Sequence, residues 1–167
     1  FQMYFLEGRD IGASDTMRQA AAEVGLDDAA AGEFLAGAGA REEVRDLVRV
    51  LEIRLEGAET DDLKRELLRR IAALRDERLS DDAGALGALS RLVPLEPTDV
   101  TARDRLAEIG KRLGAHDRVA AVLTQAAQAA EEPRLRSDIL MQVASLCETM
   151  LGDLPRAESL YQQALAI

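Results

Sequence analysis

Apolar residues recur at steps of three and four along most of this chain, which is the periodicity of amphipathic α-helices. Residues 71–97 show the pattern clearly, with apolar positions at Ile71, Leu74, Leu79, Ala85, Leu89 and Leu92. The pattern breaks at residues 80–82, Ser-Asp-Asp, which are residue types that favour turns and helix starts. This stretch predicts two helices joined by a short hinge. Because no long run of Val, Ile and Thr alternates with polar residues, we expect no strand and an all-α fold.

Glycines, prolines and capping residues predict where the other helices begin and end. Gly57 ends the first long helix, and Pro94 is expected to end the helix that begins at Asp82. Asp117 is expected to cap another helix, and Pro133 to open the next. The predicted helices are 40–56, 61–79, 82–93, 98–113, 118–130, 133–151 and 155–167.

The first 45 residues differ from the rest, since they hold four of the five aromatic side chains and several glycines. Such glycines predict short helices with tight ends. We expect helices that end at Gly8 and Gly25, and a third that Asp27 caps and that ends near Gly37 and Gly39. Together they are expected to form a small N-terminal helical cap on the first apolar surface of the following helices.

The breaks between helices recur at a regular distance. Ser80, Gly114 and Gly152 lie 34 and 38 residues apart. A helical pair that repeats at this length cannot bury its apolar face alone, so the pairs are expected to stack as an α-solenoid. The extra residues before Gly152 predict a longer helix there.

Residues 151–164 resemble the tetratricopeptide repeat, through Leu151-Gly152 followed by Ala157, Tyr161 and Ala164. The same pattern returns at residues 79–92 and 113–126, so the resemblance covers about residues 47–167. It implies three helical pairs in a tetratricopeptide-like solenoid. The chain departs from the family where a tyrosine is common, at Arg75, Gly110 and Cys147.

The resemblance also implies a concave groove, lined by the outward faces of the first helices of the pairs. The corresponding positions mix charges and lack the Asn/Lys cluster of the repeats that hold carboxylate tails, so binding of chaperone tails is not expected. The partner that the family implies is a protein or a peptide. The groove-lining positions are Arg69, Ala73, Asp76, Asp104, Glu108, Lys111, Met141, Ser145 and Glu148.

The N-terminal segment resembles a different family. FQMYFLEGRDIG at residues 1–12, Gly-Leu-Asp at 25–27 and AREEVR at 40–45 are similar to the helical insert of DsbA-like dithiol oxidoreductases. That family implies a thioredoxin sheet, a Cys-x-x-Cys motif and a cis-proline loop, and none of the three is found in the sequence. The two resemblances divide the chain into residues 1–45 and 46–167, joined through a shared helix at 40–56.

Composition narrows the choice of partners. A net charge of −10 argues against nucleic acid and against anionic membrane surfaces. No apolar run reaches the roughly 20 residues that a membrane-spanning helix needs, and no segment reads as a cleavable signal. The single cysteine excludes an intramolecular disulfide. These features favour the cytoplasm, or a recombinant origin.

Candidate catalytic residues are few. Cys147 falls on an apolar stripe and is expected to be a buried thiol rather than a nucleophile. His116, the only histidine, is expected in a solvated turn, and a single histidine without matching ligands makes no metal site. We therefore expect no enzyme, no cofactor and no metal. Capping explains the adjacent carboxylates, which are Asp27-Asp28, Glu42-Glu43, Asp61-Asp62, Asp81-Asp82 and Glu131-Glu132.

Three functions stay open at this point. We favour a non-enzymatic helical-repeat scaffold, made as an engineered or spliced chimera of two helical fragments with no evolved ligand. The alternative is a natural tetratricopeptide adaptor that binds a peptide or protein in its groove. A remnant of a DsbA-like thiol oxidoreductase is the third, and the single cysteine argues against it. Because the last helix lacks the closing proline, we also expect an uncapped apolar end through which two copies pair as a homodimer.

Overall fold

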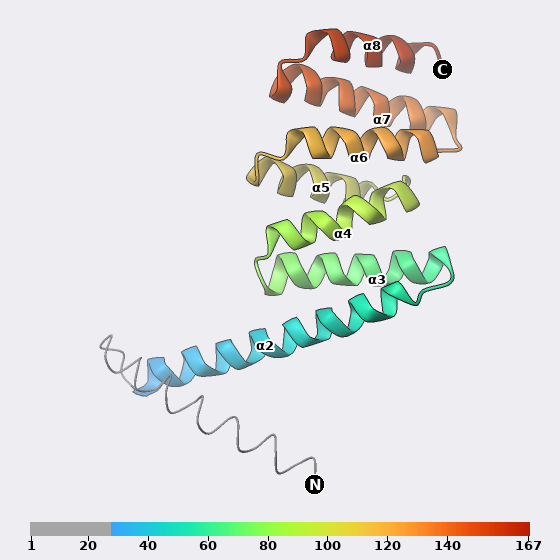
Figure 1. The fold of residues 1–167 in the computed structure, drawn as a ribbon. Helices are drawn as coiled ribbons and strands as arrows, with labels where there is room; N and C mark the ends of the chain where they lie inside the picture. The colour runs from blue at the N-terminus through green and yellow to red at the C-terminus, as the bar shows by residue number, and fades with distance from the viewer. Residues whose placement is uncertain (1–27) are drawn as a thin grey trace. The chain divides into compact units, whose positions relative to one another are not determined.

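The computed structural model describes residues 28–167, which form helices joined by short connections. The predicted all-α class is confirmed over this range, in which no strand occurs. Two π-helical segments, η1 and η2, directly continue α3 and α7. Figure 1 labels the α-helices. The bounds are α2 (Asp28–Glu56), α3 (Asp61–Ala73), η1 (Leu74–Arg78), α4 (Asp82–Leu95), α5 (Val100–Arg112), α6 (His116–Ala129), α7 (Pro133–Leu146), η2 (Cys147–Leu151) and α8 (Leu154–Leu165).

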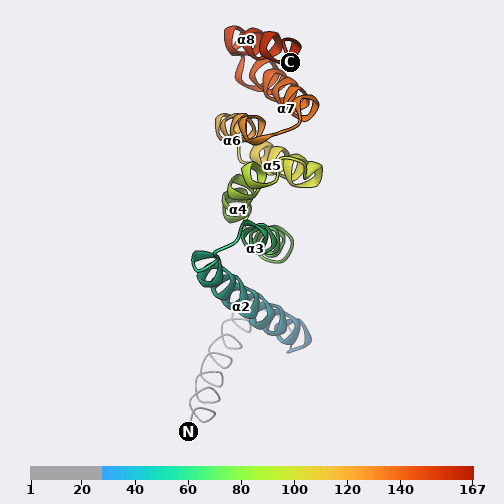
Figure 2. The ribbon, with the colours of Figure 1, turned by 90° about the vertical axis from the view of Figure 1, so that its right-hand side faces the viewer.

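The chain divides into two units, Phe1–Asp46 and Leu47–Ile167. Within the second unit each helix from α3 to α8 packs against the next one along the chain, and α4 also packs against α6. Figures 1 and 2 show these helices following one another in a row. The core is therefore a continuous apolar layer that successive helices share.

The C-terminal part of α2 contributes to this second unit. Val48, Leu51 and Leu55 are buried, and Leu55 borders the same cavity as Ile71 of α3. Arg75 of η1 forms an ion pair with Glu52 of α2. The predicted end of this helix at Gly57 is confirmed.

The N-terminal end of α2 corrects the sequence prediction. Gly37 and Gly39 were expected to separate two helices, whereas α2 runs through both of them without a break. A glycine ends a helix by adopting a left-handed conformation, and among the described residues the glycines with positive φ are Gly114 and Gly152. Inside a helix, a glycine costs only about 1 kcal/mol relative to alanine. The prediction therefore mistook tolerated glycines for stop signals. The helices expected before Asp28 lie outside the described residues.

The three predicted breaks of the second unit share one backbone conformation. Ser80, Gly114 and Gly152 are all left-handed, with φ of 53°, 64° and 66°. Each follows the first helix of a pair and lets the chain reverse before the second. The spacings between these three residues, 34 and 38, are unequal in part because of the π-helical turns. The segments η1 and η2 each add a residue before Ser80 and Gly152, whereas α5 ends before Gly114 as a regular α-helix. The expected lengthening before Gly152 is confirmed, and it occurs before Ser80 as well.

Side-chain caps begin most of the helices that follow. The side chains of Thr60, Asp81, Asp99 and Asp153 each accept a hydrogen bond from a backbone N–H in the first turn of α3, α4, α5 and α8. The prediction for Asp117 is wrong: α6 begins at His116, two residues earlier than predicted, and has no side-chain cap.

Two further helix ends differ from the sequence prediction. Pro94 lies inside the last turn of α4, which ends at Leu95. Proline lacks the N–H that would bond to the carbonyl four residues earlier, and its ring crowds that carbonyl, so it weakens this last turn; α4 nevertheless continues one residue beyond it. Helix α5 begins at Val100, two residues later than predicted, because Asp99 supplies the cap.

A small residue on one helix faces a larger side chain on its neighbour, which lets the two helices of a pair pack closely. A Cβ added to Gly110 of α5 would lie 2.1 Å from Val119 Cγ2 of α6, so glycine leaves the space that this valine fills. A Cβ added to Gly84 of α4 would lie 1.8 Å from Arg75 Nη1, which is the end of a flexible side chain that can move aside, so the restriction at Gly84 is weaker than that at Gly110.

The left-handed turns give a direct test of this fold. Replacing Ser80 by glycine is expected to raise the free energy of unfolding by about 0.5–1 kcal/mol, because the left-handed conformation strains any residue with a Cβ. Replacing Gly114 by alanine should lower it by about 1 kcal/mol, and since nothing lies within 4 Å of the added Cβ the loss would come from backbone strain alone. Urea unfolding followed by circular dichroism measures both. If the free energy of unfolding changed with the same sign in both variants, the left-handed conformation of Ser80 and Gly114 would be contradicted.

Candidate binding grooves between the first helices

Two cavities lie between the first helices of successive pairs. The first groove is the cavity of about 360 Å³ between α3, α4 and α5. The second groove is the cavity of about 500 Å³ between α5, α6 and α7 with η2. Both lie on comparable parts of successive pairs, so the side chains that border them can be compared directly.

Ion pairs bridge the first groove from α3 to α5. Arg69 Nη2 of α3 donates to Glu96 Oε2 (2.6 Å) and to Asp99 Oδ2 (3.1 Å), just before α5. From the other side, Arg105 of α5 donates to Asp76 Oδ2 (2.6 Å) and to Glu77 Oε1 (3.0 Å) of η1. These contacts raise the pKa of Arg69 and Arg105, through hydrogen bonds to Asp99 and Asp76 above all. The charged groups at this groove already have partners within the chain.

Asp76 is the centre of this ion-pair network. Its side chain is only 12% exposed and accepts hydrogen bonds from Arg105 and, at 3.0 Å, from Arg112 Nη2 of α5. Arg112 also donates to both carboxylate oxygens of Asp82, at 3.0 and 2.7 Å, and to Glu108 Oε1 at 3.3 Å. The hydrogen bond from Arg112 lowers the pKa of Asp82. The network joins the turn within the first helical pair to α5, the first helix of the next pair.

The second groove has no such bridge among the described residues. Its floor includes Val119 and Leu123 of α6, and its rim includes Met141 and Ser145 of α7. The connection from α5 to α7 is a hydrogen bond from Arg103 Nη1 to Gln142 Oε1, at 3.0 Å. This groove is therefore bordered by apolar and neutral polar groups, together with Arg103 and Asp104.

Arg103 is the charged residue that folding buries, with 5% of its surface exposed. Its Nε is buried without a hydrogen-bond partner, and no carboxylate in the part of the chain that the structure describes lies within ion-pair distance. The corresponding positions of the other two pairs hold Leu68 and Leu140, which are buried as well. The fold thus places a guanidinium where its neighbours place leucine.

The structure separates the nine predicted groove residues into several settings. Arg69 and Ala73 border the first groove, and Asp104, Met141 and Ser145 border the second. Asp76 and Glu108 belong to the ion-pair network, and Glu148 accepts a hydrogen bond from Tyr161 (2.9 Å). Lys111 is exposed on α5.

Sequence reasoning missed Arg103. Stepping three residues back from the apolar–small pairs at 71–72, 106–107 and 143–144 gives Leu68, Arg103 and Leu140. An arginine at a position where the other two helical pairs have leucine was the signal that could have identified Arg103 as unusual.

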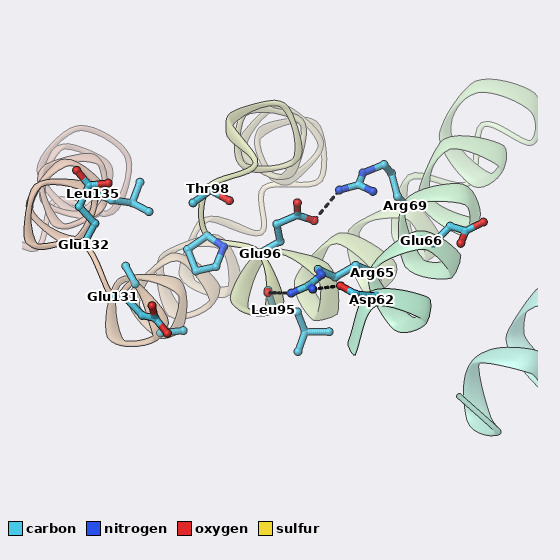
Figure 3. Close-up of a pocket in the computed structure, with 13 residues that line it drawn as sticks. Asp62, Arg65, Glu66, Arg69, Leu95, Glu96, Thr98, Glu131, Glu132 and Leu135 are labelled. Carbon is cyan, nitrogen blue, oxygen red and sulfur yellow. Dashed lines mark hydrogen bonds and ion pairs between the residues drawn. The ribbon is translucent and has the colours of Figure 1, made fainter. Parts of the chain in front are cut away.

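A third cavity, of about 680 Å³, is bordered mainly by charged side chains (Figure 3). Both of its arginines have partners: Arg65 pairs with Asp62 and donates to the Leu95 carbonyl oxygen at 3.2 Å, while Arg69 pairs with Glu96. The other charged groups at its border are carboxylates, from Glu66, Glu131 and Glu132. An acidic border alone does not define a ligand.

The remaining chemical candidates lie apart from both grooves. Cys147 is a free, fully buried thiol, as predicted, and burial raises its pKa. His116 was expected in a solvated turn, but it is half-buried and forms the first residue of α6. In residues 28–167 no group of three or more His, Cys, Asp or Glu side chains is placed to hold a metal ion.

Comparison with protein-family models, with curated proteins and with solved structures gives no match for this chain. Of the helices described, none is long and apolar enough to cross a membrane. The buried Arg103, at the border of the second groove, is the feature of these grooves that ordinary core packing does not explain.

Two substitutions should separate a buried unpaired arginine from a paired surface one. Replacing Arg103 by leucine, the residue found at both corresponding positions, is expected to raise the free energy of unfolding by about 1–3 kcal/mol, because it removes an uncompensated buried charge. Replacing Arg105 by leucine should lower it, because Glu77 loses its partner and Asp76 loses one of its two arginine partners. Urea unfolding at neutral pH measures both. A destabilised R103L protein would show that Arg103 is needed for packing.

The Arg112–Asp82 pair predicts a dependence of stability on pH. Since the folded pKa of Asp82 lies below its usual value of 3.8, the pair stabilises the fold fully above that pH and loses its effect as the pH falls through the folded pKa. Replacing Asp82 by asparagine should lower stability at pH 7 and make little difference well below pH 3.8. Asp117, in the first turn of α6, has no ion-pair partner among the described residues, so D117N is the matched control. An equal pH profile for the two variants would contradict the prediction.

Proposed function

We propose that residues 47–167 form a non-enzymatic, tetratricopeptide-like repeat scaffold whose second groove binds a segment of a protein or peptide. The three helical pairs are α3 with η1 and α4, α5 with α6, and α7 with η2 and α8. The equal conformation of Ser80, Gly114 and Gly152 supports reading them as repeats, as does the packing of each helix on the next.

The contrast between the two grooves carries this proposal. The charged groups around the first groove neutralise one another across α3 and α5. The second groove has an apolar floor at Val119 and Leu123, and a rim with the exposed Met141 and Ser145. Pockets that combine an apolar surface with a few polar groups are those in which proteins bind ligands, and methionine adapts to varied partners.

A scaffold without an evolved ligand is the other function that the sequence predicts, in the form of a chimera of two fragments. The division of the chain between Asp46 and Leu47 is compatible with such a junction, and so is the continuous helix α2, which crosses it. Compatible junctions also occur between natural domains. The two proposals differ in whether the second groove selects a peptide.

Selection of random peptides displayed on phage against the whole protein distinguishes these proposals. We expect peptides whose affinity falls about 5- to 150-fold in a Ser145→Arg variant, because a large side chain in a well-fitted groove costs about 1–3 kcal/mol. Ala73→Arg, an equally exposed change in the first groove, is the control and should change affinity less than twofold. Selection of no peptide would favour the chimera without a ligand, and equal losses in both variants would place binding elsewhere.

A further inference from the structure

The guanidinium of Arg103 lacks a countercharge within the described chain. It is 5% exposed, its Nε has no partner, and its Nη1 donates to a neutral amide, Gln142 Oε1. Arg69, Arg105 and Arg112, on the same series of helices, each pair with carboxylates. Burying a charge without an ion partner is costly, and such groups in native proteins are normally paired. The fold retains this cost at the border of an open cavity.

We propose that Arg103 binds the side-chain carboxylate of a glutamate carried by the peptide segment that enters the second groove. This inference rests on the function proposed above and identifies the chemistry of the ligand. A guanidinium presents a planar fork of donors that matches a carboxylate, and charge-assisted hydrogen bonds of this kind are stronger than neutral ones. The carboxylate would accept hydrogen bonds from the terminal N–H groups of the guanidinium at the border of the cavity, whereas Nε is closed to solvent and would report the bound charge.

Because Arg103 lies deeper in the groove than Asp104, the groove favours the carboxylate of a side chain over the terminal carboxylate of a peptide. Arg103 is buried, whereas the adjacent Asp104 is exposed at the border of the same cavity. A carboxylate attached directly to a peptide backbone would come close to Asp104 before it reached Arg103. A glutamate carries its carboxylate on two methylene groups, which can pack against Val119 and Leu123 of the floor. The groove therefore fits an acidic side chain better than a chain end.

The charges that oppose such a ligand are also defined. The protein has a net charge of −10, and Asp104 is the carboxylate that borders this cavity. Repulsion from exposed charges is screened by salt, whereas contacts with a buried charge are screened much less. We therefore expect removal of Asp104 to strengthen binding modestly, and removal of Arg103 to weaken it strongly.

Small capped amino acids test this assignment on the intact protein. The probes are N-acetyl-glutamate α-amide, which has only a side-chain carboxylate, and its isomer N-acetyl-glutamine, which has only a terminal one. N-acetyl-glutamine α-amide is the neutral control. The readout is the Nε–Hε resonance of Arg103 in nitrogen–proton spectra at constant ionic strength, assigned by its loss in an Arg103→Lys variant. The resonances of Arg105 and Arg112 serve as internal controls for binding elsewhere.

We expect a saturable shift of the Arg103 resonance with N-acetyl-glutamate α-amide, with at least threefold weaker binding of N-acetyl-glutamine and no shift with the neutral probe. Backbone resonances of Ala107 and Ser145 report the same binding in variants. Arg103→Leu should weaken it about tenfold or more, Arg103→Lys less than that, and Asp104→Asn should strengthen it by about 1.5- to 5-fold. R103K retains the charge, so it remains informative should R103L alter the packing.

Other results would overturn the inference. These are the absence of a saturable shift with N-acetyl-glutamate α-amide, an equal response to the neutral probe, and tighter binding of N-acetyl-glutamine. Retained binding in R103L would exclude Arg103 as the ligand-binding group. If the probes fail while selected peptides still lose affinity in the Ser145→Arg variant, the carboxylate assignment is wrong and the groove remains the binding site. If the probes do not bind and no selected peptide loses affinity in the Ser145→Arg variant, the proposed function itself is wrong.

Discussion

Close contact between helices through small side chains is the interaction on which this fold depends. Ala85, Ala120, Ala126 and Ala144 are essentially inaccessible to solvent, and they allow neighbouring helices to approach until the larger side chains interlock. Gly110 takes this furthest, since even a methyl group there would collide with Val119. Because such contacts recur along the row, the core can be long and thin without leaving helix surfaces empty.

This way of building a core lets the helices carry different charged groups. An ion-pair network around Asp76 connects η1 with α5, whereas Arg103 of α5 is buried without an ion partner among the described residues. Packing does not require an arginine at position 103, because buried leucines, Leu68 and Leu140, occupy the corresponding positions.

Much of the helical pattern could be predicted from local signals. The breaks at Ser80, Gly114 and Gly152 were placed correctly, since serine, glycine and aspartate next to a break in apolar periodicity have few other roles. The buried state of Cys147 followed from its position on an apolar stripe. The errors arose where one residue type has two uses. Helix α2 continues through Gly37 and Gly39 without a break, and Asp117 lies in the first turn of α6 instead of capping it.

The amino-acid sequence by itself determined that the described chain is helical, where its hinges lie and which stripes of each helix are apolar, because periodicity and capping act over a few residues. Only the tertiary structure decided which charges meet. Arg69 and Asp99 are 30 residues apart in sequence, as are Arg112 and Asp82, and no local rule pairs them. The isolation of Arg103 has the same origin: whether a charge finds a partner depends on the groups that distant helices bring within a few ångströms, and that distance is set by packing.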